Sequence, residues 1–294
     1  MAPSPDTPRA SARTFAGLFL ITFATLTYQL LLTRTFSVTM YYHFAFVAIS
    51  VTMFGMAVGA VAVFLRPALF APEHAARQLA AGSAVFAVTT VLSYLTHLSI
   101  PFVLDTSLVT IFGLALTYTA LSVPFIASGV VVSIALTRFP RQVSALYAAD
   151  LGGAALGCLV VGPVLRYADA PTAVLGTAAV AGAAAWIFAA GREHAAGEPQ
   201  GHGLRRACVV IALILAAATA AHAVAARHNS GWMRLVWVKG QFEARPLVEK
   251  WNSFSRVRVI GNPDKFIRPS GWGLSTTLPA DRSARELHLD IDSY

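Results

Sequence analysis

Seven apolar runs, separated by short polar segments, constrain the fold of this chain more than any other feature. The runs are Phe15–Leu32, Phe44–Leu65, Leu79–Leu98, Leu108–Leu136, Ala145–Leu165, Ala173–Ala190 and Ala207–Ala226. A membrane-spanning helix needs about 20 predominantly apolar residues. The chain is 56% hydrophobic and only 12% charged, whereas a soluble domain has about 25% charged residues. We therefore predict an all-α polytopic membrane helix bundle of about seven spans over residues 15–226, with the lipid bilayer as its main partner.

Two regions make the number of spans sensitive to error. The fourth run is longer than a straight span requires, and Pro124 lies inside it. Proline cannot donate the helical hydrogen bond, so we expect a kink there. The last two runs are rich in alanine, which makes them the weakest candidates for spans. An error of one span would move the C-terminal segment to the other side of the membrane.

Residues 1–14 are polar and rich in proline, and they carry Arg9 and Arg13. A secretory signal peptide begins in the same way, but it ends at a small-x-small cleavage site. The first apolar run ends instead at Tyr28–Arg34 (YQLLLTR). We interpret it as a retained first span that follows a short cytoplasmic tail.

Arginine is distributed unequally between the two sides of the predicted bundle. One side holds nine: Arg9, Arg13, Arg66, Arg77, Arg138, Arg141, Arg192, Arg205 and Arg206. The short loops of the other side hold two, Arg34 and Arg166. Positively charged loops remain in the cytoplasm, so we predict a cytoplasmic N-terminus in a cell inner or plasma membrane. Seven spans then place residues 227–294 outside.

Residues 227–294 have the composition of a soluble segment. Three stretches alternate like half-buried strands: MRLVWVKGQF, SFSRVRVIG with Phe254, Val257 and Val259 as its apolar positions, and RELHLDID with Leu287, Leu289 and Ile291. The segment has 11 Lys/Arg against 7 acids, a net charge of +4. This is too mild for nucleic-acid binding. Three or four short strands make a thin domain, and the chain stops directly after a strand, so we expect a small β-rich segment that is incomplete.

Asp150 lies inside the fifth apolar run, next to closely spaced glycines. If the helix begins near Ser144, Asp150 lies about 9 Å along it, near one membrane face rather than the midplane. A carboxylate inside a span is a functional-site hypothesis by default. The structural alternative is an interfacial acid that pairs with Arg138 or Arg141, or that bonds a neighbouring helix.

Two small-residue stripes are candidate helix contacts. One comprises Tyr147, Asp150, Ala154, Gly157 and Val161, with Gly153 and Gly157 forming a G-x-x-x-G pair; the other comprises Ala48, Thr52, Gly55, Gly59 and Ala62. Small residues let the backbones of membrane helices approach closely. We predict that both stripes form helix contacts, with each other as one arrangement, and that such faces could also join copies of the chain into a homo-oligomer.

A second group of polar and aromatic residues lies at the outer ends of the first two spans. Gln29 is a polar side chain inside the first span, and Arg34, Tyr41, Tyr42 and His43 follow. An aromatic belt with a snorkelling arginine explains the group. The alternative is a polar funnel that leads to a binding site between helices.

Motifs that would identify a catalytic or metal site are missing from the sequence. The histidines lack metal-site spacing, and no P-loop, G-x-G-x-x-G or G-x-S-x-G is present. Cys158 and Cys208 both lie in apolar runs, which indicates buried thiols rather than a disulfide or a zinc site. We therefore assign no catalytic, cofactor-binding or metal-binding residue.

Four stretches, in order, resemble the membrane half of a bacterial family that fuses a multi-span domain to a spermidine-synthase-like domain. They are YQLLLTRTFS, YHFAFVAIS, VPFIASGVVVSIAL and YAADLGGAALGCL. In the tail, EKWNSFSRVRVIG (Glu249–Gly261) resembles the opening of the small β-domain of spermidine synthases, and LHLDID (Leu287–Asp292) resembles its next strand. The family's Ser-x-Tyr-Gln-type stretch reads Ser253, Phe254, Ser255, Arg256 here, so its glutamine does not match.

The resemblance implies a membrane-tethered aminopropyl- or methyl-transferase-like protein. In that family a Rossmann-like domain follows, which binds S-adenosylmethionine or its decarboxylated form and carries the catalytic aspartates. None of these residues can be assigned here, so the 294-residue chain is expected to be inactive in that chemistry. A domain that uses an adenosyl cofactor is expected to face the cytoplasm, which conflicts with seven spans and a cytoplasmic N-terminus. The alternatives are a small-molecule transporter-like module and a membrane anchor or scaffold.

Overall fold

The computed structural model describes residues 9–103, 105, 107–190, 200–271, 273–279 and 281–293. Seven α-helices make up most of this part of the chain: α1 (Ala12–Thr39), α2 (Ala45–Leu65), α3 (Ala75–Ser99), α4 (Leu108–Arg138), α5 (Val143–Tyr167), α6 (Ala170–Ala190) and α7 (Gln200–Arg227). All seven are long and apolar enough to cross a membrane. The prediction of seven long, apolar helices that could each span a membrane is confirmed. Arg192, one of the nine arginines used for orientation, lies outside the described residues.

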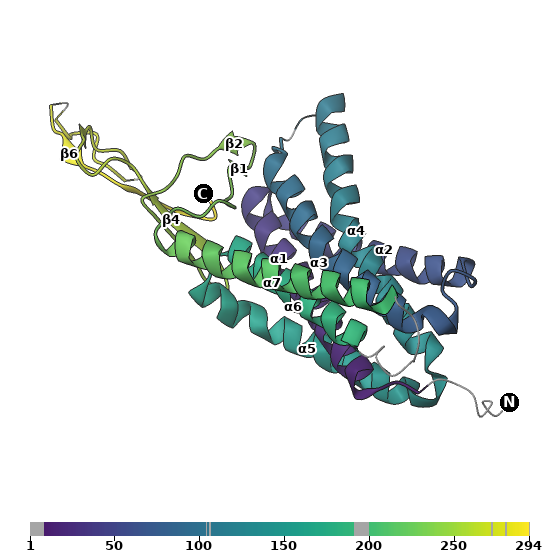
Figure 1. Ribbon diagram of the computed structural model, residues 1–294. Helices are drawn as coiled ribbons and strands as arrows, with labels where there is room; N and C mark the ends of the chain where they lie inside the picture. Colours follow the sequence, from purple (N-terminus) through teal and green to yellow (C-terminus); the bar gives the residue numbers. More distant parts are fainter. Residues whose placement is uncertain are drawn as a thin grey trace.

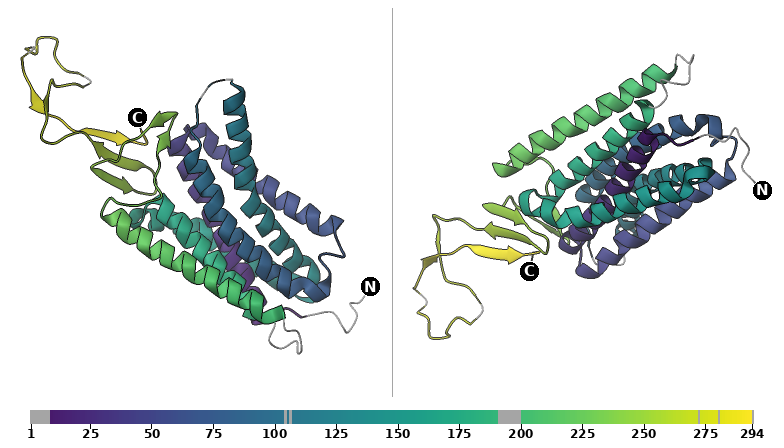
Figure 2. Two further views of the ribbon diagram at one scale, coloured as in Figure 1. Left: turned by 45° about the horizontal axis from the view of Figure 1, so that its top comes forward. Right: turned by 90° about the horizontal axis from the view of Figure 1, so that it is seen from below.

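Helix α1 lies inside the bundle, and α7 lies on its outside. α1 contacts α2, α4, α5 and α6, whereas α7 packs mainly on α6 and touches α3. The start of α1 and the strands of the C-terminal segment lie at opposite ends of the bundle (Figures 1 and 2). An odd number of helices produces this separation, because each helix returns the chain to the other end.

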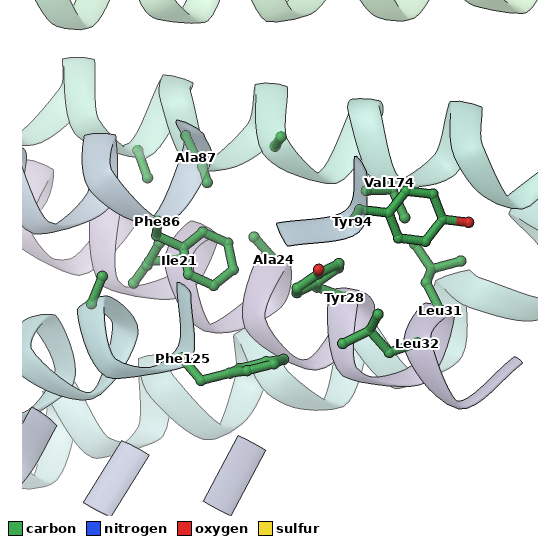
Figure 3. Close-up of a cluster of buried hydrophobic side chains, with 14 of the residues drawn as sticks. Ile21, Ala24, Tyr28, Leu31, Leu32, Phe86, Ala87, Tyr94, Phe125 and Val174 are labelled. Atoms are coloured by element: carbon green, nitrogen blue, oxygen red, sulfur yellow. The ribbon is translucent and has the colours of Figure 1, made fainter. Parts of the chain in front are cut away.

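The core of the bundle is built around Tyr28 of α1 (Figure 3). Its ring stacks on Phe125 of α4 at 5.4 Å between centroids and meets Phe86 of α3 edge-on at 6.5 Å. Its hydroxyl lies 2.9 Å from Ser93 Oγ, and Thr25 Oγ1 lies 2.6 Å from Ser128 Oγ. A buried hydroxyl costs free energy unless it is bonded, so these pairs let α1 carry polar groups through an apolar interior.

Pro124 does not interrupt the fourth span. α4 is one α-helix from Leu108 to Arg138 with Pro124 inside it. Its first turn is capped by Ser107, whose Oγ accepts from the Thr110 backbone N–H at 3.2 Å. Proline is tolerated inside membrane helices when neighbouring groups bond the main-chain carbonyl that it leaves free.

Each small-residue stripe packs on a different helix, and neither packs on the other. A Cβ at Gly153 would overlap the Phe19 carbonyl oxygen of α1, and one at Gly157 would lie 2.6 Å from the Phe23 carbonyl oxygen. A Cβ at Gly55 would lie 2.6 Å from Phe125 Cβ of α4.

The second stripe also brings the backbones of α2 and α4 close together at Gly59. A Cβ at Gly59 would overlap the Ile126 carbonyl oxygen of α4, and one at Gly129 of α4 would lie 2.8 Å from Met56 Cα of α2. The prediction of helix contacts is correct, and the pairing of the two stripes with each other is wrong. Both glycine faces are occupied within one chain.

The buried face of α5 is rotated from the predicted one. Tyr147 is 51% exposed, and the buried positions are Leu146, Gly153, Gly157, Val161 and Leu165. Asp150 lies half-buried beside this face. Cys158 is exposed on the other side of α5, so its predicted burial is wrong, whereas Cys208 is buried.

The described residues of the C-terminal segment form seven short strands: β1 (Trp237–Val238), β2 (Gln241–Phe242), β3 (Val248–Trp251), β4 (Arg256–Ile260), β5 (Phe266–Ile267), β6 (Ala284–Arg285) and β7 (His288–Ile291). They form a β1–β2 hairpin, an antiparallel three-stranded sheet in the order β3-β4-β7, and a β5–β6 pair. A small β-rich segment after the helices is therefore confirmed.

The three-stranded sheet presents its apolar face outward, contrary to expectation. Val248, Val259 and Leu289 are cross-strand partners, and Leu289 is 61% exposed. Phe254 lies before β4 rather than in it and is 84% exposed. The most buried side chain of β4 is instead Arg256, at 2% exposure. The alternation correctly predicts a strand. The buried face, however, is the one that carries Arg256, not the one that carries Val257 and Val259.

Candidate functional site

The C-terminal segment is attached to the bundle at the end of α1. Lys239 and Gly240 form the two-residue turn between β1 and β2, and both have positive φ (50° and 80°). This turn type suits the twist of a hairpin. It presents the Lys239 backbone N–H to the Thr39 carbonyl oxygen at 2.7 Å. Lys239 Nζ donates to the Asp292 carbonyl oxygen at 2.7 Å, which joins the hairpin to the end of β7.

Arg34 is the predicted site residue that takes part in this attachment. Its Nη1 donates to Ser37 Oγ at 3.0 Å, and its Nη2 lies 3.8 Å from Asp292 Oδ1. Asp292 Oδ1 also accepts from the Arg256 backbone N–H at 2.7 Å. The side chain of Arg34 is 19% exposed, so it lies between the bundle and the β segment rather than extending freely to a lipid headgroup.

His43 and the neighbouring tyrosines form an aromatic group beside this attachment. His43 stacks on Tyr41 at 5.9 Å and meets Tyr42 at 4.7 Å. Tyr41 in turn lies under Lys239 Nζ at 5.9 Å from the ring centroid. Gln29 is half-buried in α1, one to two turns before Arg34. Tyr41 and His43 therefore contact each other, and Arg34 is linked to Tyr41 indirectly, through Asp292 and Lys239.

Arg256 is the centre of a buried network of charged side chains. Its Nη1 donates to Glu243 Oε2 at 2.7 Å. Its Nε and Nη2 donate to the two carboxylate oxygens of Glu249 at 3.0 and 3.1 Å. Paired bonds between a guanidinium and a carboxylate are strong and fix orientation. Glu243 follows β2, so the network ties the hairpin to the sheet.

Arg258 extends the network across the sheet. It lies 3.0 Å from Glu243 Oε1 and 2.7 Å from Asp290 Oδ2. Trp251 Nε1 donates to Glu249 Oε1 at 2.8 Å. Burial acts to raise the pKa of Glu249, but the charge and hydrogen bonds of Arg256 outweigh it and hold that pKa below its ordinary value.

Because the pKa of Glu249 is lowered, we expect the β segment to become less stable at acid pH. A carboxylate whose folded-state pKa is depressed contributes stability above its unfolded-state value, near 4.5 for Glu249, and loses it as pH falls through the folded-state pKa. We expect backbone amides of β3 and β4 to exchange hydrogen faster below this range, relative to amides of α3. Equal protection of β3 and β4 at pH 3 and pH 7 would contradict this role of Glu249.

A cleft of about 730 Å³ lies between the ends of α5, α6 and α7 and the segment that leads into β3. Behind its wall, His222 of α7 is fully buried. Its Nδ1 lies 2.8 Å from Thr172 Oγ1 and 3.9 Å from Asp169 Oδ1. Its Nε2 lies 3.1 Å from the Met233 carbonyl oxygen. His222 therefore connects α6, α7 and the start of the β segment.

Asp150 contributes to helix packing through its backbone. Its carbonyl oxygen accepts from Thr22 Oγ1 of α1 at 3.0 Å. Among the residues that the structure describes, its carboxylate forms no ion pair, so the predicted pairing with Arg138 or Arg141 is not observed.

Replacing Asp150 by Asn should therefore change the free energy of unfolding by no more than about 0.5 kcal/mol, because the observed contact to α1 uses the main chain. Unfolding by dodecyl sulfate in mixed micelles measures this difference. A loss above about 2 kcal/mol would show that the charge itself is needed.

Sequence reasoning found Arg34 and His43 but missed the residues that bind the β segment most firmly. Arg256 was noted only as a mismatch to a family motif, and Glu243 and Asp292 were not singled out. The available signal was the alternation R-V-R-V in Arg256–Val259, which places two arginines on one face of a strand.

Within the described part of the chain, no three His, Cys, Asp or Glu residues lie close enough to hold a metal ion. Comparisons of the chain with protein-family models, curated proteins and solved structures find no match.

Proposed function

We propose that this chain is the membrane domain of a membrane-tethered spermidine-synthase-like protein, whose role is to hold a transferase-like unit against one end of the bundle. The observation that carries the proposal is the orientation of the β3-β4-β7 sheet. Its charged face is buried against the rest of the chain, and its apolar face, with Val248, Leu289 and Ile291 at 47%, 61% and 52% exposure, is open. An apolar sheet face is stable only when another layer covers it. In the family that the sequence resembles, the expected cover is the transferase unit.

S-adenosylmethionine or its decarboxylated form is the cofactor that this proposal implies for the transferase unit. The experiment is a transfer assay on membranes that contain the native protein, with a labelled adenosyl donor and a polyamine or other amine acceptor. We expect transfer of the aminopropyl or methyl group, and its loss when Leu289 and Ile291 are both replaced by aspartate. A native protein that transfers neither group to any amine would contradict the proposal.

We further propose a cytoplasmic N-terminus in the inner or plasma membrane. The excess of arginine at the end of the bundle where α1 begins supports this orientation. A cytoplasmic N-terminus with seven spans places the β segment outside, away from cytoplasmic adenosyl donors. A reporter that is active only outside the cytoplasm, fused after Ser230, tests this point. Reporter activity restricted to the cytoplasm would reverse the orientation and remove the conflict with the cofactor.

A small-molecule transporter remains the second candidate, and one observation favours it. An open cleft of about 480 Å³ lies between α2 and α4. Its lining contains the hydroxyl-bearing residues Ser50, Tyr118, Thr119 and Ser122 beside the apolar Val51, Phe54, Val58 and Ile126. The Tyr118 hydroxyl is buried and has no hydrogen-bond partner among the described residues. Uptake of a polar solute by liposomes that contain the whole 294-residue chain would support transport. A scaffold would show neither uptake nor transfer.

A further inference from the structure

The cleft of about 730 Å³ lies at the end of the bundle where the helices meet the β segment. Its walls come from the last turn of α5, the first turn of α6, the last turn of α7 and residues 229–251. These are the ends of helices that are long and apolar enough to cross a membrane, so we expect the cleft at the boundary between hydrocarbon and water. Residues 245–251 of the β segment form one wall of the cleft, which is partly open to the outside.

The charged groups of this cleft favour an anion. Its lining contains five cations, Arg166, Arg227, Arg234, Arg245 and Lys250, and two carboxylates, Asp169 and Glu249. Five minus two leaves a net charge of +3.

Both carboxylates already have partners within the chain. Glu249 is bound by Arg256 and Trp251. Asp169 accepts from the Thr172 backbone N–H at 3.0 Å, and its burial raises its pKa. Neither carboxylate is therefore available as the main recognition group for a cationic ligand.

None of the five cations has an ion-pair partner within the described chain. Three of them, Arg166, Arg227 and Lys250, also donate no side-chain hydrogen bond there, and Lys250 belongs to β3 rather than to a helix end. Arg166 ends α5 and Arg227 ends α7, and both side chains are exposed. By contrast, Arg234 and Arg245 donate to the carbonyl oxygens of Glu243 and Gly231. Arg166 and Arg227 therefore remain available for a ligand that approaches from the membrane.

Apolar residues form much of the rest of the lining, beside the polar Thr172 and Asn229. Leu165, Pro171, Met233, Pro246, Leu247 and Val248 contribute to the walls. A ligand that fits a basic rim and an apolar wall at this depth carries an anionic group and a hydrocarbon part. Basic pockets between membrane helices bind the phosphate groups of lipid headgroups in this way.

We propose that this cleft binds the phosphate group of an anionic phospholipid, with Arg166 and Arg227 as its main partners. The planar guanidinium groups can each donate two hydrogen bonds to phosphate oxygens. The acyl chains would lie along the ends of α5 and α7. The site shares Val248 with the apolar sheet face, but its main partners, Arg166 and Arg227, lie on helices outside the sheet, and it uses no adenosyl cofactor.

The test is a lipid titration of the whole chain in detergent, followed by native mass spectrometry. The probes are phosphatidylglycerol and phosphatidylcholine with the same acyl chains. We expect the first phosphatidylglycerol to bind at least ten-fold more tightly than phosphatidylcholine. Each cation near a membrane surface contributes about 1 kcal/mol, so replacing both arginines (Arg166→Gln with Arg227→Gln) should weaken phosphatidylglycerol binding about 30-fold.

Matched variants separate this site from general attraction to lipid and from misfolding. Arg77→Gln removes the same charge at the opposite end of the bundle, and it should leave the first phosphatidylglycerol bound as before. Arg166→Lys with Arg227→Lys keeps the charge and should retain most of the binding.

Three results would overturn the proposal. If the double glutamine variant binds phosphatidylglycerol as tightly as the unaltered chain, these arginines do not bind the lipid. Equal affinities for phosphatidylglycerol and phosphatidylcholine would show that the cleft does not prefer an anionic headgroup. Displacement of phosphatidylglycerol by inorganic phosphate alone would assign the cleft to a free phosphate instead of a lipid.

Discussion

Replacing Arg256 by Met should release the β segment from its buried network. The change leaves the Glu249 carboxylate in a largely buried position with only the Trp251 N–H as a partner. Removing one member of a buried ion pair costs about 3–5 kcal/mol, because the remaining charge is uncompensated. We expect hydrogen exchange of β3 and β4 amides to accelerate by a factor of about 100 to 4,000.

A rescue variant distinguishes loss of the charge network from general disruption. Arg256→Met together with Glu249→Gln removes both charges, so it should recover most of the lost protection. Glu243 keeps Arg258 as a partner in both variants. Arg282→Met, on an exposed arginine of the same segment, should have no effect. If Arg256→Met exchanges like the unaltered chain, the network does not hold the sheet in place.

Replacing Gly153 by Ala should separate α5 from α1. The added Cβ would overlap the Phe19 carbonyl oxygen and the Thr22 hydroxyl, and it would also disturb the bond from Thr22 to the Asp150 carbonyl oxygen. Overpacking costs about 1–3 kcal/mol, and an interhelical hydrogen bond in a membrane contributes about 0.6 kcal/mol on average. We expect a loss of about 2–3 kcal/mol in the free energy of unfolding in mixed micelles.

The adjacent glycine provides the matched control. A Cβ at Gly152 would lie 3.5 Å from the Phe19 ring, an ordinary contact. Gly152→Ala should therefore be neutral or stabilising, because alanine favours a helix by up to about 1 kcal/mol over glycine. Equal effects of the two substitutions would show that the close approach of α1 and α5 does not depend on Gly153.

The helices of this fold were predictable because hydrophobic length is a local property. Runs such as Phe44–Leu65 can satisfy their main-chain groups in a membrane only as helices, and α2 ends at Leu65 as expected. The partners of the small-residue faces were not predictable. Gly55 and Gly153 permit close approach to any backbone, and the choice of α4 and α1 depends on the arrangement of the whole bundle.

The candidate site was less predictable than the fold. Arg34 and His43 were identified because polar residues at the end of a span are conspicuous. Arg256 was not, because alternation shows that a strand has two faces but does not show which face is buried. The usual assumption that the apolar face is buried failed here, since Glu243 and Glu249 supply partners that make burial of an arginine favourable.

The arrangement rests on one central claim, that seven spans place the β segment across the membrane from the loop between α2 and α3. Single cysteines at Glu73 in that loop and at Ser270 in the β segment test it, after Cys158 and Cys208 are replaced by alanine. An impermeant thiol reagent applied to spheroplasts should label the cysteine at position 270 and leave the one at position 73 unlabelled until the membrane is opened. If both positions react, or both are protected, in closed spheroplasts, the seven-span arrangement is wrong.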